Sequence, residues 1–128
     1  MRDKSHYNIS DSFEVEIFCS DNGKCPLKKY IDKQTNHKKA VIKRYLKLLE
    51  KYGNELCMPY SKKIDKYIYE LRIENYGYNI RILYFFLENR RIVVTSAFDK
   101  KTNKTPPKYI EIANIYRESW LIRRKKWN

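Results

Sequence analysis

Residues 67–98, YIYELRIENYGYNIRILYFFLENRRIVVTSAF, decide the fold. Apolar and polar residues alternate over 67–74 and over 79–87, as they do in half-buried strands. Residues 91–98 are rich in β-branched side chains, which strands favour. The connections 75–78 and 88–90 have the lengths of hairpin loops. This stretch therefore predicts three strands in an antiparallel meander.

The first hairpin also predicts which residues face each other. A four-residue loop pairs Glu74 with Asn79. That register places Arg72 opposite Arg81 on one face of the sheet. Two like charges in direct opposition destabilise a sheet unless an acid or an anion lies between them. Glu70, on the same face as Arg72, would supply the acid, whereas bound phosphate would supply the anion; the pattern leaves both open.

Upstream of the meander, the pattern predicts one strand and two helices. Residues 13–19 alternate as a strand, and Pro26 fits the first position of a short helix. A wide apolar stripe from about His37 to Tyr52 predicts a longer helix, which Gly53 is placed to end. We expect residues 54–66 to form a loop.

Downstream, a closing helix completes the fold. Thr105 is placed to cap a helix that Pro106 begins, and we expect the basic tail, 123–128, to be frayed. The order of elements is β-α-α-β-β-β-α. The sequence thus predicts an α+β fold, in which an antiparallel sheet packs against helices.

The length of 128 residues fits one domain, with its core at about 13–122. The longest apolar run, 82–87, is far shorter than the roughly 20 residues of a membrane span. Residues 1–12 lack the apolar core of a signal peptide. We therefore expect a soluble, cytoplasmic protein without a membrane partner.

Cysteine and histidine are too few and too scattered to predict a metal site. Cys19, Cys25 and Cys57 are an odd number with no C-x-x-C pair, which is typical of neither a disulfide framework nor a zinc site that would include His37. We expect reduced thiols and no metal. His6 and His37 lie outside the expected strands, which disfavours a histidine-centred catalytic triad.

The formal charge of +13 is unevenly distributed. Residues 24–66 carry thirteen basic and four acidic residues, and residues 99–128 carry nine and three. A surplus of this kind attracts polyanions. Charge alone does not distinguish RNA, DNA, an acidic protein partner or simple solubility. With only three glycines, the chain has no glycine-rich phosphate loop.

A series of short motifs resembles a known family in order and spacing. Together the motifs span roughly residues 13–116. They are Gly23-Lys24-Cys25-Pro26, Tyr52-Gly53, Met58-Pro59-x-x-Lys62-Lys63-Ile64, Tyr69-Glu70-Leu71-Arg72-Ile73, Arg81-Ile82-Leu83-Tyr84-Phe85, Phe98-x-Lys100-Lys101-x-x-Lys104-Thr105-Pro106 and Glu111-Ile112-Ala113. The series resembles the phage-derived, HigB-like branch of the RelE superfamily of toxins.

This resemblance implies a RelE-like fold and a toxin of a type II toxin–antitoxin system. Such toxins inhibit translation as mRNA interferases, endoribonucleases that cut mRNA on the ribosome through its own 2′-hydroxyl, without metal or cofactor. The implied antagonist is a HigA-like helix-turn-helix antitoxin. Two alternatives stay open: a ParE-like inhibitor of DNA gyrase, which shares the fold, and an inactive nucleic-acid-binding regulator.

The resemblance also implies roles for individual residues. Arg81 matches the strand arginine that contacts the scissile phosphate, Lys101 a basic position at the end of the last strand, and Lys62 the loop lysine. We expect these three to be catalytic. A second set of cations is expected to bind RNA phosphates: Arg72, Lys63, Lys100 and Lys104. Three tyrosines are further candidates, although Tyr84 equally fits the core: Tyr84, Tyr109 and Tyr116.

RNA cleavage needs a base for the 2′-hydroxyl and cations for the phosphate. Arginine binds two phosphate oxygens and stays protonated, whereas lysine acts as a base only where its pKa falls. Crowding by Arg81, Lys100 and Lys62 is expected to lower the pKa of Lys101. Lys101 is therefore the expected base or charge stabiliser, with Lys62 assisting, and the general acid is unassigned.

Overall fold

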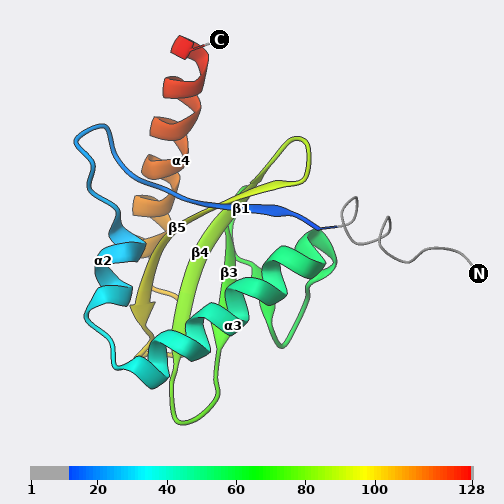
Figure 1. The fold of residues 1–128 in the computed structure, drawn as a ribbon, viewed down its shortest axis with the longest axis vertical. Helices are drawn as coiled ribbons and strands as arrows, with labels where there is room; N and C mark the ends of the chain where they lie inside the picture. Colours follow the sequence, from blue (N-terminus) through cyan, green and yellow to red (C-terminus); the bar gives the residue numbers. More distant parts are fainter. Residues whose placement is uncertain (1–11, 128) are drawn as a thin grey trace, which may run out of the picture.

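The computed structural model describes residues 12–127 and has mixed α+β architecture (Figure 1). The expectations for a signal peptide and for His6 fall on residues 1–11, outside this range. In chain order the elements are β1 (Glu14–Ile17), α2 (Pro26–Asp32), α3 (Asn36–Tyr52), a short 3-10 turn (Gly53–Glu55), β2 (Ser61–Lys63), β3 (Tyr69–Ile73), β4 (Ile80–Leu87), β5 (Arg91–Asp99) and α4 (Pro107–Trp127).

The strands form one sheet in the order β1-β5-β4-β3-β2. The predicted meander of β3, β4 and β5 is confirmed, and each neighbouring pair in it is antiparallel. At one edge β1 runs parallel to β5, so the sheet is not antiparallel throughout. At the other edge β2 extends the sheet from within the stretch expected to be a loop. Its sequence, Ser-Lys-Lys, lacks an apolar alternation that would predict a strand.

Helices cover both faces of the sheet (Figure 1). On one face α2 and α3 bury Leu27, Val41 and Leu49 in a core that includes Leu71 and Ile82. On the other face Ala113 of α4 packs in a second core, with Leu83 and Phe85 of β4. Because alternate residues of a strand point to opposite faces, the even positions 80, 82 and 84 of β4 lie in the first core and the odd positions 83 and 85 in the second.

The helix ends agree with the sequence in part. Pro26 begins α2, and Gly53 follows α3 with a φ of 50°, a backbone conformation that favours glycine. Thr105 does not cap α4, which begins at Pro107; its hydroxyl instead donates to a carboxylate of Glu70. The expected frayed tail is also wrong, because the helix continues through 123–127.

Cys19 and Cys25 form a disulfide, which contradicts the expectation of three reduced thiols. A tight turn explains the pairing. The Ser20 amide donates to the Lys24 carbonyl, and the Gly23 amide donates to the Ser20 carbonyl, so the chain reverses between the two cysteines. Cys57 is free and exposed. Along residues 12–127, no helix has the length and apolar character needed to cross a membrane.

Candidate functional site

Arg72 and Arg81 are directly opposed on β3 and β4, as the hairpin pattern predicted. Arg72 Nη1 donates to Glu70 Oε2 at 2.8 Å, and Arg72 Nη2 donates to Glu74 Oε2 at 3.4 Å. Arg81 Nη2 donates to the same oxygen of Glu74, and Arg81 Nε lies 3.7 Å from Glu70. Two carboxylates thus offset two guanidinium charges. We refer to these four residues as the arginine–carboxylate cluster.

The four members of the cluster differ widely in burial. The side chain of Arg81 is fully buried and that of Glu70 is 3% exposed, whereas Arg72 is 15% and Glu74 is 48% exposed. Arg81 Nη1 also donates to Asn79 Oδ1 and to the Ile80 carbonyl, each at 3.1 Å. Arg81, expected to contact the scissile phosphate, therefore lies beneath the surface, whereas Arg72 reaches it.

A pocket of about 280 Å³ opens beside the cluster. Its wall is strongly basic and comes from β2, β3 and the loop between β5 and α4. The lysines and the arginine that line it are Lys62, Lys63, Arg72, Lys100 and Lys104. We call it the Lys100 pocket. It brings together all four residues expected to bind phosphate and one of the three expected to be catalytic, Lys62.

Lys100 is held firmly at the end of β5. Its amide donates to the Asn79 carbonyl at 2.7 Å, and Asn79 Nδ2 donates to the Lys100 carbonyl at 2.9 Å. Burial lowers the pKa of Lys100, and the charges of Arg81 and Arg72 lower it further, against the opposing carboxylates of Glu70 and Glu74. The pKa of Lys100 is thus lowered, which is the direction that a base requires, and Lys100 lies one residue before the expected position.

Lys101 lies in a neighbouring hollow rather than in the Lys100 pocket. That hollow is lined by Lys101, Lys108 and Tyr109, and Lys100 contributes to both. Tyr109 stacks on Phe98 with ring centroids 3.9 Å apart. The structure therefore does not unite Lys101 with Lys62 and Arg72.

The other two candidate tyrosines belong to the core or to a distant surface. Tyr84 is fully buried and shares a hydrogen bond with the Ser61 hydroxyl. Burial raises the pKa of Tyr84 to about 12. Tyr116 stacks on Phe18 at 4.6 Å and lines a pocket beside α2. Neither ring lines the Lys100 pocket.

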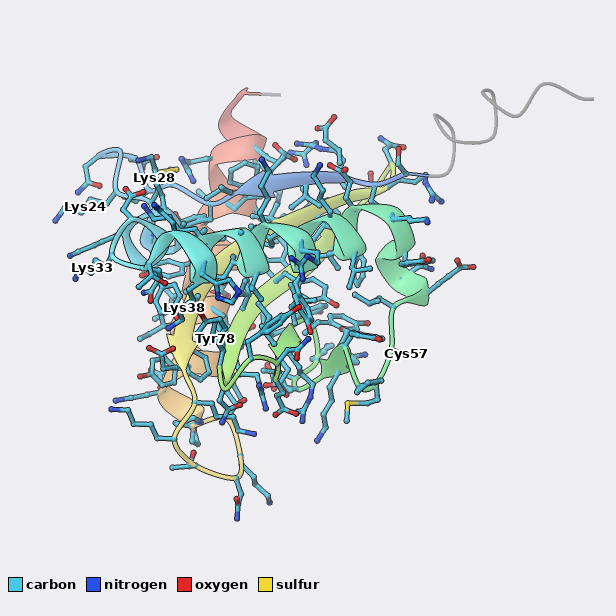
Figure 2. The ribbon with its side chains drawn as sticks, turned by 60° about the horizontal axis from the view of Figure 1, so that its bottom comes forward. Lys24, Lys28, Lys33, Lys38, Cys57 and Tyr78 are labelled. Atoms are coloured by element: carbon cyan, nitrogen blue, oxygen red, sulfur yellow. A yellow bond between two sulfur atoms is a disulfide. The ribbon has the colours of Figure 1, made fainter. Side chains whose placement is uncertain are left out.

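Much of the surplus charge lies away from this pocket. Figure 2 shows Lys24, Lys28 and Lys33 projecting from the α2 end of the molecule, whereas Cys57 lies beyond the opposite end of α3. Within residues 12–127 no cluster of three or more histidine, cysteine or acidic side chains is arranged to hold a metal ion. Instead, His37 Nδ1 pairs with the hydroxyl of Tyr78 at 2.7 Å.

Sequence reasoning missed Glu74 and Asn79 as site residues. The signal for Glu74 was present, because Glu70, Arg72 and Glu74 occupy alternate positions and therefore share a face of β3. Asn79 carried no such signal. Its role depends on the hydrogen bonds that it forms with Lys100 and Arg81 once the hairpin has closed.

The family comparison covers the whole site. The model of a family of phage-derived, Gp49-like proteins matches residues 29–118, which include α3, β2 to β5 and every residue of the Lys100 pocket. No curated protein matches the chain significantly. The matched family is associated with RelE-like toxins, and the match does not single out the HigB branch. Because the match spans most of the chain, this protein belongs to the phage-derived, Gp49-like family of toxin-like proteins.

Proposed function

We propose that this protein is the toxin of a type II toxin–antitoxin system, a HigB-like mRNA interferase that cleaves mRNA on the ribosome at the Lys100 pocket. The observation that carries the proposal is the convergence of four lysines and Arg72 on one small pocket inside the region that matches the family. Such a wall is suited to the closely spaced phosphates of an RNA strand.

Lys100 is the proposed base, because it lines the pocket and its pKa is lowered by burial and by the charges of Arg81 and Arg72. Neutral Lys100 removes the proton from the 2′-hydroxyl, and the 2′-oxygen forms a bond to the adjacent phosphorus. The bond from phosphorus to the 5′-oxygen breaks, which leaves a 2′,3′-cyclic phosphate. The departing 5′-oxygen takes a proton from the ammonium group of Lys62 or Lys104. The reaction involves no oxidation or reduction, and it needs no cofactor.

Arg72 stabilises the charge that develops on the phosphate. Its guanidinium group reaches the pocket, and Glu70 holds it from behind at 2.8 Å. Preorganised cations of this kind are often the largest contribution to catalysis. Arg81 lies deeper in the protein, where it donates to Glu74 in the RNA-free protein and helps to lower the pKa of Lys100. Lys101 contributes attraction from the neighbouring hollow.

The basic surface outside the pocket accounts for the expected partners. Lys24, Lys29 and Lys33 line a surface pocket beside α2, where they provide general attraction to ribosomal RNA. The same charge would attract an acidic antitoxin, for which a HigA-like helix-turn-helix protein is proposed. An activity on translating ribosomes places the protein in the cytoplasm.

Primer extension on cellular mRNA after induction tests this function. The wild type is expected to produce cuts within translated codons, and Lys100→Ala is expected to abolish them. Lys47→Ala removes one exposed charge from α3 and serves as the matched control that keeps cutting. Inhibition of gyrase supercoiling without mRNA cuts would overturn the proposal, and so would RNA binding with neither effect.

A further inference from the structure

One carboxylate oxygen holds both arginines of the cluster. Glu74 Oε2 accepts from Nη2 of Arg72 at 3.4 Å and from Nη2 of Arg81. The two guanidinium groups come from opposite strands and converge on this single anionic atom. An oxygen of a phosphate group, which arginine binds by charge-assisted hydrogen bonds, fits the same pair of donors.

We propose that Glu74 is an internal substitute for phosphate, and that an RNA phosphate displaces it to bind Arg72 and Arg81. This inference deepens the proposed function and rests on it for the identity of the ligand. In the RNA-free protein the Glu74 carboxylate balances part of the positive charge of the two arginines. It therefore competes with an RNA phosphate for the same hydrogen-bond donors.

Glu74 is the member of the cluster that can leave. It lies just beyond the end of β3, in the hairpin, and nearly half of its side chain is exposed. Glu70 cannot leave in the same way, because it lies within β3, is 3% exposed and also accepts from Thr105. Water reaches the exposed half of the Glu74 side chain and can solvate its carboxylate once it leaves, whereas the buried Arg81 that it leaves behind needs another anion.

When Glu74 leaves, one hydrogen-bond donor of each arginine becomes available to a phosphate. Arg81 Nη1 keeps its bonds to Asn79 and to the Ile80 carbonyl, so the side chain stays in place. Arg81 Nη2 forms its hydrogen bond with Glu74, and the loss of that partner frees a donor for phosphate. Arg72 remains bound to Glu70 through Nη1, while its Nη2 is also released. A fully buried arginine thereby becomes available to an anion.

The net charge of the arginine–carboxylate cluster also favours phosphate binding once Glu74 has left. With Glu74 in place the cluster has two positive and two negative side chains, and without it one positive charge is unbalanced beside Lys100. The single negative charge of an RNA phosphodiester restores the balance. The site therefore favours exchange of one anion for another over a vacancy.

Binding of a short 2′-O-methyl RNA, which cannot be cleaved, measures this exchange by fluorescence anisotropy at fixed salt. Glu74→Gln should bind about threefold to fivefold more tightly than wild type, because one competing ion pair is removed. Glu88→Gln makes the same charge change in the exposed β4–β5 turn, and should alter affinity by less than about twofold. Equal gains in both variants would overturn the proposal.

The same substitution in a second variant protein distinguishes competition between Glu74 and phosphate from the general attraction of RNA to a more positive protein. In an Arg72→Gln protein, Glu74→Gln should give a clearly smaller gain, because one of the two donors that Glu74 blocks is missing. An undiminished gain would contradict the proposal. Tighter RNA binding by Glu74→Gln without any mRNA cleavage would refute the enzymatic function alone. Cleavage by the wild type, with no affinity difference between the Glu74 and Glu88 variants, would refute this inference alone.

Discussion

Arg72 and Arg81 face each other across β3 and β4, and both donate to Glu74. The two side chains lie at different depths: Arg72 lines the Lys100 pocket, whereas Arg81 is fully buried. Glu70 contacts both guanidinium groups from the buried side. The cluster therefore supports the pocket structurally and sets the electrostatic environment of Lys100 at the same time.

Glu70→Gln should destabilise the protein strongly. The substitution removes a buried negative charge and leaves the guanidinium of Arg81 with only the exposed Glu74 to balance it. Breaking a buried ion pair from one side costs about 3–5 kcal/mol. Urea denaturation checks this, with Glu88→Gln as the exposed control. A loss of unfolding free energy no larger than that of the control would show that Glu70 is not the central acid.

Lys100→Ala and Lys101→Ala should differ sharply in cleavage. Lys100 lines the same pocket as Lys62 and Arg72, whereas Lys101 lies in the adjacent hollow. Loss of a general base slows a reaction by about 10²–10⁴-fold. We expect that loss for Lys100→Ala in a ribosome-coupled cleavage assay, and a much smaller one for Lys101→Ala. The reverse order would return the role of base to Lys101, the residue expected from the sequence to be the base or charge stabiliser.

The cleavage rate should rise with pH and level off above the pKa of Lys100. A protonated lysine cannot accept the 2′-hydroxyl proton, so activity is lost as pH falls below that pKa. The midpoint should lie below the ordinary value for lysine, because burial, Arg81 and Arg72 lower it. In the RNA-free protein the carboxylate of Glu74 opposes this shift, so Glu74→Gln should move the midpoint of the kcat/KM profile to lower pH. A kcat/KM midpoint that Glu74→Gln leaves unchanged would argue against Lys100 as the base.

Gly53→Ala should destabilise the end of α3 more than Gly77→Ala destabilises the β3–β4 hairpin. Both glycines have positive φ, 50° and 78°, which costs an L-residue about 1–2 kcal/mol. A Cβ at residue 53 would also lie 2.1 Å from Cε1 of Phe13, whereas residue 77 has open space. Overpacking adds about 1–3 kcal/mol. Thermal melting of both variants measures the difference, and equal losses would exclude the clash.

The meander and its register were predictable because they depend on local patterns. A turn of fixed length and a two-residue period suffice to place Arg72 opposite Arg81. The strand β2 was not predictable in the same way. Ser61–Lys63 is short and polar, and it becomes a strand only because β3 offers it a free edge.

The sequence predicted most of the residues that line the candidate site, but not how deeply each of them is buried. Lys62, Lys63, Arg72, Lys100 and Lys104 do share one pocket. Arg81 is fully buried and donates to Glu74 and Asn79, an arrangement that no sequence pattern specifies. The choice between Lys100 and Lys101 depends on the two hydrogen bonds between Lys100 and Asn79, which form only after the sheet is assembled. The disulfide likewise depends on a turn that joins residues six apart.

Cleavage of mRNA by the purified protein on translating ribosomes, mapped by primer extension, tests the central claim most directly. The mRNA is compared with one in which the nucleotide before the cut carries 2′-deoxyribose. We predict cuts in the ordinary mRNA only when ribosomes are present, and no cut at the 2′-deoxy position. Equal cutting of the two mRNAs would contradict attack by the 2′-hydroxyl. The absence of any cut, with the protein folded and ribosomes translating, would contradict the assignment as an mRNA interferase.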